Sequence, residues 1–348
     1  MKEYDVIVIG GGIIGLAFTL AYSRKKNVKI AIIDPTECNP KISSSFHTRV
    51  SAITPSSKDF LSSINVWDDI KRKRGFVATK VWDQNSHGRL NFYAKDEGIE
   101  HLGFIVENDL IQSSLFNAID QTKVKFIDAK LINLIKTDFG YQVALDNEQI
   151  LSCRMVVGAD GPKSKVRSLA GIEVNEYDYH QKAIIANIVC EQPLENATWQ
   201  RFLSDSILAL LPLSENQASI VWSCKELFAE ELEELDDNKF NQALSEAAEY
   251  RFGNLKLQSS RNIFPLVSRS AKHYTLSNLA LIGDAAHSIH PLAGQGANLG
   301  ISDAAELTKQ LVENNDKPLG ESLVLRKYAR ARRLDNELMS KTMTGLDW

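Results

Sequence analysis

The chain has 348 residues, a formal net charge of −4 at pH 7 and a sequence pI near 6.0. Its length exceeds the roughly 250 to 300 residues that a single hydrophobic core usually serves, so two domains are expected. The acidic balance argues against a nucleic-acid partner, which normally requires a basic balance or a clustered basic face.

The first predicted element is a short strand over residues 4–9 that leads into a glycine-rich loop. Gly10, Gly12 and Gly15 match the spacing G-x-G-x-x-G, and Ile13 and Ile14 open the following helix. In this pattern the first glycine permits a tight turn, the second lets backbone N–H groups approach a pyrophosphate, and the third lets the helix pack on the strand. The pattern predicts dinucleotide binding; the alternative is a glycine-rich turn without a ligand.

The second predicted strand, residues 29–33, ends in an acid. Asp34 lies about 20 residues after the last glycine of the loop, where a carboxylate that binds a ribose hydroxyl is expected. Arg49 then precedes an apolar run, and it is either an exposed loop cation or a bidentate partner for an anion. The basic runs 71–74 and 326–333 are expected to be solvated helix faces, although such faces also attract anionic lipid.

The middle of the chain predicts a sheet. Residues 77–92 alternate in polarity around Asn85-Ser86-His87-Gly88, which predicts a β-hairpin. Strands are also predicted within 183–189 and 207–221, and a helix over 228–252 on the outside of this sheet. Asn108, at the start of a further helix, is predicted as its N-cap.

Two more strands end in an acid beside a glycine. Residues 155–158 lead to Asp160 and Gly161, where Asp160 either closes a turn, pairs with Arg167, or binds a ligand as well. Residues 279–282 lead to Gly283 and Asp284, whose carboxylate is suited to accept hydrogen bonds from sugar-like hydroxyls. The glycine-rich segment that follows ends in a helix near Asn298, whose first N–H groups are open to a carbonyl or an anion.

These three motifs, in this order, resemble those of the aromatic-ring flavoprotein hydroxylases, in which they contact the two halves of FAD. The segment from His290 to Gly300, followed by Asp303, is similar to the signature of the ubiquinone-biosynthesis hydroxylases. Similar runs at 49–53, 102–108, 209–213, 221–223 and 264–266 extend the resemblance over nearly the whole chain. Residues 81–83 and 178–179 look most like the 2-polyprenylphenol hydroxylase branch, which acts ortho to the phenol.

The resemblance implies an α/β fold in which an FAD-binding Rossmann-like domain of the GR2 type carries an inserted β-sheet substrate domain. The FAD-binding domain would be discontinuous and comprise residues 1–75, 107–172 and 271–348. Residues 76–106 and 173–270 would form the substrate-binding sheet. Members of that family usually continue for some tens of residues beyond the position of Trp348 through C-terminal helices, so this chain is expected to be either trimmed or a shorter homologue, and membrane or partner docking stays open.

The implied activity is FAD-dependent monooxygenation of a polyprenylphenol ring in ubiquinone biosynthesis. NAD(P)H would reduce the flavin, O2 would form a C4a-hydroperoxide, and its distal oxygen would pass to the ring. No catalytic acid or base is identified; His290, Pro291, Gly294 and Gln295 would lie beside the flavin. FAD contacts are implied for Gly10, Gly12, Ile13, Ile14, Gly15, Asp34, Arg49, Asn108, Asp160, Gly161, Gly283, Asp284, Pro291, Gly294, Gly296, Ala297 and Asn298.

Other features concern location and rival functions. The four cysteines and the histidines lack metal-ligand spacing, so reduced thiols and no metal are expected. No apolar run is long enough for a membrane span, and a cytoplasmic protein is expected, with peripheral contact at the inner membrane face left open. Two rivals also stay open: a flavoprotein acting on another aromatic substrate, and a non-catalytic flavoprotein subunit of a biosynthetic complex.

Overall fold

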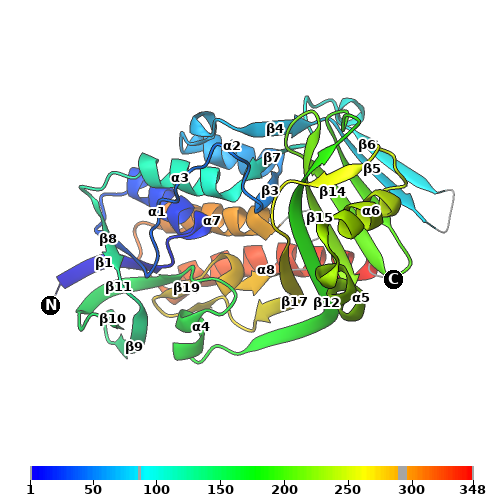
Figure 1. Ribbon diagram of the computed structural model, residues 1–348. Coiled ribbons are helices and arrows are strands. Elements are labelled where there is room, and N and C mark those ends of the chain that lie inside the picture. The colour runs from blue at the N-terminus through cyan, green and yellow to red at the C-terminus, as the bar shows by residue number, and fades with distance from the viewer. Residues whose placement is uncertain (1, 85–87, 289–295, 347–348) are drawn as a thin grey trace.

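The computed structural model describes residues 2–84, 88–288 and 296–346, and it contains three β-sheets with helices packed around them (Figure 1). The first sheet has the strand order β18-β19-β11-β1-β2-β8, and the β9–β10 hairpin joins it at β11. Its strands are β1 (Lys2–Ile9), β2 (Ile30–Asp34), β8 (Val124–Asp128), β9 (Leu131–Thr137), β10 (Gly140–Leu145), β11 (Ile150–Gly158), β18 (Thr275–Leu276) and β19 (Leu279–Leu281).

The central strands of this sheet are parallel and buried. Strands β8, β2, β1, β11 and β19 pair in parallel, and residues 6–9, 30–33 and 155–157 are continuous apolar runs with almost no solvent contact. Such runs are typical of parallel strands that are covered on both faces. All these strands therefore end at the same edge, where the three acid-and-glycine motifs follow them.

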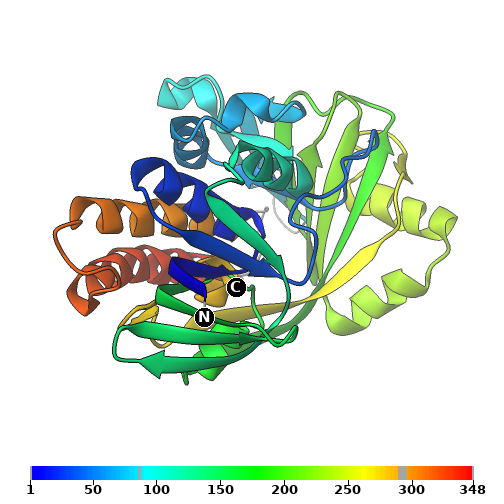
Figure 2. The same cartoon turned by 90° about the vertical axis from the view of Figure 1, so that its left-hand side faces the viewer.

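A layer of helices covers one side of the first sheet. Helix α1 packs between α7 and α3, and α7 packs against α8, as Figure 2 shows. The helices of this layer are α1 (Ile13–Lys25), α2 (Pro55–Ser63), α3 (Asn108–Ala118), α7 (Gly296–Glu313) and α8 (Ser322–Leu346). The short helix α4 (Lys165–Leu169) lies apart from this layer, against β9. Short 3-10 turns also occur at η1 (Trp67–Asp69), η2 (Ala94–Glu97) and η3 (Gly283–Ala285).

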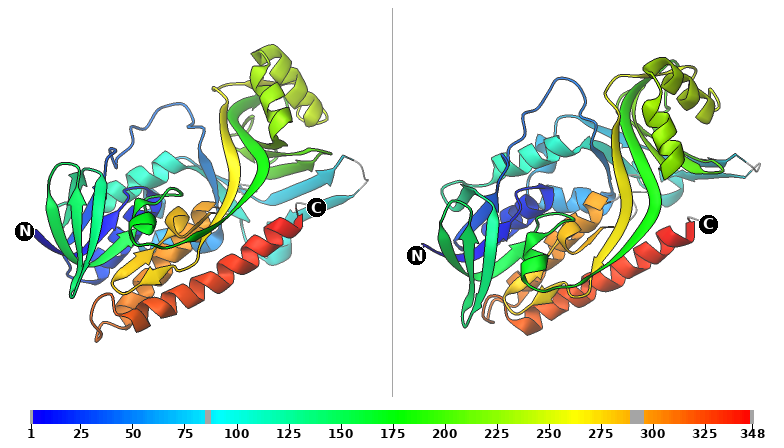
Figure 3. Two further views of the ribbon diagram at one scale, coloured as in Figure 1. Left: turned by 90° about the horizontal axis from the view of Figure 1, so that it is seen from below. Right: turned by 60° about the horizontal axis from the view of Figure 1, so that its bottom comes forward.

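The second sheet has the strand order β20-β17-β12-β15-β14-β13-β5-β6, with β16 beside β12. Its strands are β5 (Ala78–Asp83), β6 (Arg89–Tyr93), β12 (Val174–Cys190), β13 (Ala197–Phe202), β14 (Ser206–Pro212), β15 (Gln217–Lys225), β16 (Leu255–Leu257), β17 (Asn262–Ala271) and β20 (His287–Ser288). The pairs are antiparallel except for β13 with β5. The long curved pair of β12 and β17 connects the two halves of the molecule (Figure 3).

The two faces of the second sheet have different neighbours. Helices α5 (Glu226–Glu234) and α6 (Asp237–Ala247) cover the outer face, where Ile184, Ile188 and Trp222 pack against Phe240. The inner face, which includes Ala209, Leu211 and Val221, packs toward the third sheet of β3 (Val50–Ile53), β7 (Gly103–Glu107) and β4 (Lys73–Phe76). We propose the same discontinuous domain division as the sequence predicts, since separate apolar clusters serve the two larger sheets.

Several local predictions can be compared with these elements. Strands β5 and β6 pair antiparallel, which confirms the predicted hairpin; residues 85–87 of its turn lie outside the described residues. The single helix expected over 228–252 is wrong, because the chain forms α5 and α6 and breaks at Leu235. Asp236 starts the second helix by accepting a hydrogen bond from the backbone N–H of Lys239 at 2.9 Å. A capping aspartate therefore interrupts an otherwise helical composition.

The basic run 71–74 is not a solvated helix face. It leads into strand β4, and Arg72 donates two hydrogen bonds to the carboxylate of the buried Glu107, each of 2.9 Å. Lys73 donates to the carbonyls of Trp67 and Ile70. These cations hold the third sheet to its surroundings, so they are not a free basic patch.

One buried carboxylate joins the last helices to the first sheet. Asp303 of α7 is fully buried, and its Oδ2 accepts a hydrogen bond from the N–H of Gly283 at 2.8 Å and lies 2.6 Å from Nε2 of His287. Its Oδ1 accepts a hydrogen bond of 2.7 Å from Nε of the buried Arg332 on α8. Burial alone would raise the pKa of Asp303, but His287 and Arg332 lower it below its usual range. The end of β19, strand β20, α7 and α8 therefore share one charged centre.

Replacing the Asp303 carboxylate by an amide should show its contribution to the free energy of unfolding. In Asp303→Asn the guanidinium of Arg332 stays buried without its counter-charge, so we expect the free energy of unfolding at pH 7 to fall by about 3 to 5 kcal/mol. Because the pKa of Asp303 is lower in the folded than in the unfolded chain, the folded state binds fewer protons at acidic pH. The advantage of the wild type is therefore complete above pH of about 4 and is lost as the pH falls through the folded pKa.

Urea denaturation of both proteins from neutral to acidic pH measures this difference. The control is Asp316→Asn, which alters an exposed carboxylate beside Lys317 and should change little. A difference between wild type and Asp303→Asn that stays constant with pH would contradict the assignment.

Candidate cofactor and substrate site

The glycines of the loop after β1 are of two kinds: some are closely packed by neighbouring atoms, and one faces open space. Gly10 has φ of +109°, and a Cβ there would lie 2.2 Å from the carbonyl oxygen of Ala159. A Cβ on Gly15 would lie 2.0 Å from the oxygen of Gly10, whereas one on Gly12 would meet nothing within 4 Å. Gly10 and Gly15 thus permit close packing, while Gly12 presents bare backbone to open space. Since no side chain caps α1, the N–H groups of its first turn remain suited to an anion.

The residues that open α1 connect this loop to the other glycine motif. Ile13 and Ile14 are half-buried, and Ile14 lies against Gly283 and Gly300, where a Cβ would approach its side chain to 3.2 and 2.7 Å. A larger residue at Gly300 would displace α7 from α1. The helix layer is therefore closely packed beside the loop.

Asp34 lies at the end of β2, next to the glycine loop. Its carboxylate accepts a hydrogen bond of 2.7 Å from the N–H of Gly11 and one of 2.8 Å from the N–H of Thr36. The acid predicted to bind a ribose thus also fixes the loop. Gln112 of α3 supports the same loop by donating to the carbonyls of Gly11 at 3.2 Å and Cys38 at 3.1 Å.

Gln112 and Cys38 were not found by sequence reasoning. The Cys38 sulfur lies so close to the loop that a Cβ on Gly11 would come to 2.2 Å from it. Burial and the nearby Asp34 raise the pKa of this thiol to about 11, so it stays protonated at neutral pH. Cys153, Cys190 and Cys224 are buried and free, in agreement with the expected reduced thiols.

The motif at Asp160 is joined to the one at Asp284. Asp160 accepts hydrogen bonds from the hydroxyl of Ser164 and from the N–H of Lys165, at 2.5 and 2.7 Å, and so stabilises the start of α4. Arg167 does not bond to Asp160; it donates hydrogen bonds of 2.8 Å to the carbonyls of Ala285 and Pro162. Gly161 has φ of +80°, and a Cβ there would meet nothing within 4 Å, so the backbone is open at this position too.

Asp284 and Arg49 face the same region. The Asp284 side chain is accessible to solvent, with buried neighbours on both sides in the chain. Poor hydration there raises the pKa of its carboxyl, and His287 and Arg49 oppose the shift. The guanidinium of the exposed Arg49 forms no hydrogen bond or ion pair with the residues that the structure describes. It is therefore available to an anionic group.

Two predicted contact residues are engaged by the protein. Asn108 is the first residue of α3 and not its N-cap, which is Glu107; its Oδ1 accepts a hydrogen bond of 2.7 Å from the hydroxyl of Ser51. Asn298 accepts from the N–H of Thr54 at 3.0 Å and donates to the carbonyl of Ala52 at 2.8 Å. These amides hold β3 against α3 and α7, which leaves backbone groups as the natural ligand contacts at these positions.

The remaining predicted residues belong to the loop before α7. His290, Pro291, Gly294 and Gln295 lie outside the described residues. Gly296 and Ala297 form the first turn of α7, and nothing lies within 4 Å of a Cβ on Gly296. The described residues contain no cluster of three histidines, cysteines or acids that could hold a metal ion.

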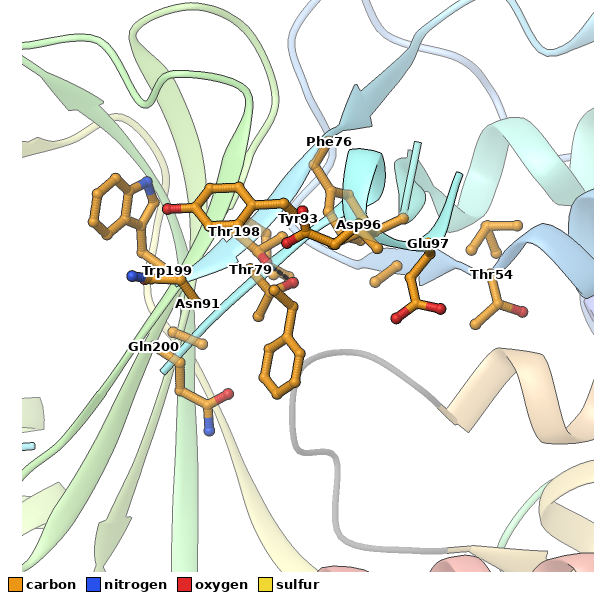
Figure 4. A pocket seen from close by; sticks show the side chains of 16 residues that line it. Thr54, Phe76, Thr79, Asn91, Tyr93, Asp96, Glu97, Thr198, Trp199 and Gln200 are labelled. Atoms are coloured by element: carbon orange, nitrogen blue, oxygen red, sulfur yellow. Dashed lines mark hydrogen bonds between the residues drawn. The ribbon is translucent and has the colours of Figure 1, made fainter. Parts of the chain in front are cut away.

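A cavity of about 450 Å³ lies between the inner face of the second sheet and the third sheet. Figure 4 shows side chains from β5, β6, β13 and η2 around it. The hydroxyls of Thr79 and Thr198 are 2.9 Å apart in its wall. Its lining residues are Ala52, Ile53, Thr54, Phe76, Thr79, Asn91, Phe92, Tyr93, Asp96, Glu97, Leu102, Thr198, Trp199, Gln200, Ala209 and Leu211. A space of this size and apolar character is typical of a small-molecule site.

Comparisons with known proteins agree with the arrangement of the motifs. A family described as "FAD binding domain" matches residues 3–340. The ubiquinone biosynthesis monooxygenase COQ6 of Danio rerio is 32% identical over 99% of this chain and 81% of its own length. The 3-demethoxyubiquinol 3-hydroxylase of Escherichia coli is 32% identical over 97% of this chain and 88% of its own.

Solved structures share the fold. The Pseudomonas aeruginosa protein PqsL, crystallised with 2-aminobenzoylacetate, superposes with a TM-score of 0.83 at 20% identity over 98% of this chain and 94% of its own. The p-nitrophenol 4-monooxygenase PnpA of Pseudomonas putida gives 0.77 at 18% identity, over 99% and 89%. Within the described residues, no helix is both long and apolar enough to cross a membrane.

The contrast between two glycines gives a test of the FAD site. In Gly12→Ala the added methyl group meets open space in the protein, so stability should be nearly unchanged while FAD affinity falls about tenfold through overlap with the ligand. Gly15→Ala should instead lower the free energy of unfolding by about 1 to 3 kcal/mol, because its Cβ has no room. Thermal denaturation of the apoprotein and fluorescence titration with FAD separate the effects. Full FAD affinity in a folded Gly12→Ala protein would be inconsistent with this geometry.

Asp284 gives a second test. Because the pKa of its carboxyl is raised in the folded chain, the ionised form destabilises the apoprotein at any pH above that pKa. Asp284→Asn should therefore leave the apoprotein equally stable or more stable at pH 7. FAD affinity should fall by about 10- to 100-fold, since a charged hydrogen-bond acceptor is lost. Melting curves check the stability of the apoprotein, and fluorescence titration checks the FAD affinity. Unchanged FAD affinity in Asp284→Asn would show that Asp284 does not contact FAD.

Proposed function

Because the chain belongs to the FAD-dependent monooxygenase family that includes the hydroxylases of ubiquinone biosynthesis, we propose that it hydroxylates the ring of a polyprenylphenol. The observation that carries the choice of substrate is the charge of the cavity wall. None of its described lining residues is a lysine, arginine or histidine, and Asp96 and Glu97 are acidic. A neutral phenol with an apolar tail fits this wall.

An aromatic acid is the rival substrate, and the cavity disfavours it. A buried carboxylate requires a cationic or strongly hydrogen-bonding partner, and two further carboxylates nearby would repel it. The cavity instead offers the apolar side chains of Phe76, Leu102 and Leu211 and a few neutral polar groups. The second rival, a non-catalytic flavoprotein subunit, would form no hydroxylated product, so the labelling experiment below distinguishes it from the proposed enzyme.

The residues of the first sheet suit FAD. The open backbone at Gly12 and the uncapped start of α1 would receive the pyrophosphate, and Asp34 the adenosine ribose. Asp284 would accept hydrogen bonds from the ribityl hydroxyls, and Arg49 would pair with an anionic group. When bound and reduced by NAD(P)H, FAD supplies the activation of O2 and the transfer of one oxygen atom.

The protein's own contribution to the reaction would be orientation and exclusion of water. In the Thr79–Thr198 pair one hydroxyl donates to the other, so one O–H remains to donate to a phenol oxygen in the cavity. Apolar side chains around the pair exclude water, and holding the ring in one orientation supplies a share of the rate.

The finer assignment to the 2-polyprenylphenol branch is also a proposal. Of the residues that suggest it, Trp82 is buried and does not itself line the cavity; it packs against the lining residue Trp199 and donates a hydrogen bond of 3.1 Å to Glu249. Val81, its neighbour on β5, lies on the face of the sheet that lines the cavity. Among these residues, we propose that Val81 influences the position at which the ring is hydroxylated. We also propose peripheral membrane contact, based on the apolar tail of the proposed substrate. The basic run 71–74 does not support this contact, because Arg72 and Lys73 form hydrogen bonds within the protein.

Isotope labelling tests the proposed reaction. The FAD-loaded chain, supplied with NAD(P)H, labelled O2 and a short-tailed polyprenylphenol, should release a product carrying one labelled oxygen atom. Labelled water with ordinary O2 is the control and should give no label. Product without label from O2 would contradict monooxygenation. NAD(P)H oxidation without any product, for the phenol and for a hydroxybenzoate alike, would favour the non-catalytic subunit.

A further inference from the structure

The inner face of the second sheet carries an uncharged row of side chains from the cavity to the edge of the sheet. Cross-strand pairing places Leu90 opposite Val81, Val81 beside Gln200, and Gln200 opposite Ala209. Residues paired in this way project from the same face of a sheet. Gln200 and Ala209 line the cavity, so the row continues the cavity wall outward to Leu90.

A second row runs parallel to the first. Phe92 is opposite Thr79, and Thr79 is beside Thr198. Phe92 lies two residues from Leu90 and therefore on the same face. It lines the cavity and is nevertheless 52% exposed, while Leu90 is 57% exposed. Phe92 is thus both a wall of the cavity and part of the outer surface.

Both rows end at β6, which is the last strand of its sheet. From Ala209 on β14 to Leu90 on β6 the row crosses three strand spacings of about 4.8 Å, or about 14 Å in all. Exposed leucine and phenylalanine side chains at a sheet edge are costly in water unless they meet an apolar partner. Figure 1 shows the β5–β6 hairpin extending away from the rest of the sheet.

We propose that the isoprenoid tail of the substrate leaves the cavity along these two rows and passes out over the edge of β6 between Leu90 and Phe92. The inference rests on the proposed function, because it concerns the tail of the same phenol. The ring stays near the Thr79–Thr198 pair, and the first isoprene units cover Val81 and Gln200. Leu90 then contacts only the units beyond the cavity, so it discriminates between long and short tails.

The test uses the FAD-loaded full chain and phenols with tails of one, two, three and four isoprene units. We expect kcat/KM of the wild type to rise with tail length. In Leu90→Ser the ratio of kcat/KM between the longest and the shortest tail should fall by about five- to tenfold, because an apolar contact with the outer units is lost. Leu90→Met, which keeps an apolar side chain of similar volume, should restore most of the ratio.

The matched control is Phe139→Ser. Phe139 is 87% exposed at the turn between β9 and β10, on the other sheet, so its loss should leave the ratio unchanged. A ratio that is the same in Leu90→Ser as in the wild type would overturn the tail path, and so would turnover of all phenols by the wild type without regard to tail length. In both cases the proposed hydroxylation would stand. Failure of the wild type to convert any phenol would overturn the hydroxylation and the tail path together.

Discussion

The structure depends on a carboxylate that has no access to water. Asp303 binds the backbone after β19, the imidazole of His287 and the guanidinium of Arg332, so three segments from the last quarter of the chain are held at one point. A buried charge requires such partners, and removing any one of them leaves the others uncompensated. Because Gly283 and Asp284 lie just after β19, this centre also fixes the position of the Asp284 carboxylate, which we propose as an FAD contact. Stability and the geometry of the proposed FAD site therefore depend on the same side chain.

Much of the fold could be predicted because its signals are local. Continuous apolar runs, the glycine spacing after β1 and the acids after β2, β11 and β19 identify a parallel sheet with a dinucleotide site at one edge. Hydrogen bonds between side chains far apart in the sequence leave no comparable local pattern. The bond of Arg72 to Glu107 and the support of the glycine loop by Gln112 depend on contacts across 35 and 101 residues. The helix over 228–252 failed for a local reason, since Asp236 competes as a cap within a helical composition.

The candidate site has one part suited to a charged ligand and another part suited to an uncharged one. On the side of the first sheet, backbone N–H groups and the guanidinium of Arg49 are suited to an anionic ligand. On the side of the second sheet the cavity wall has no cation among its described residues and is mostly apolar. The amides of Asn108 and Asn298 lie between the two, where they fasten β3 to the helices. One part of the molecule is therefore suited to a charged cofactor and the other to an uncharged ring.

The chain order of the cofactor motifs has a consequence for folding. Strands β1, β11 and β19 are neighbours in the sheet, yet they begin at residues 2, 150 and 279, and the second sheet is largely made between the last two. Closing such long loops costs entropy before the contacts between their ends form. During synthesis the glycine loop after β1 is complete early, but its partners at Asp160 and Asp284 follow only when most of the chain exists. The proposed FAD site is therefore complete only after most of the second sheet has been made.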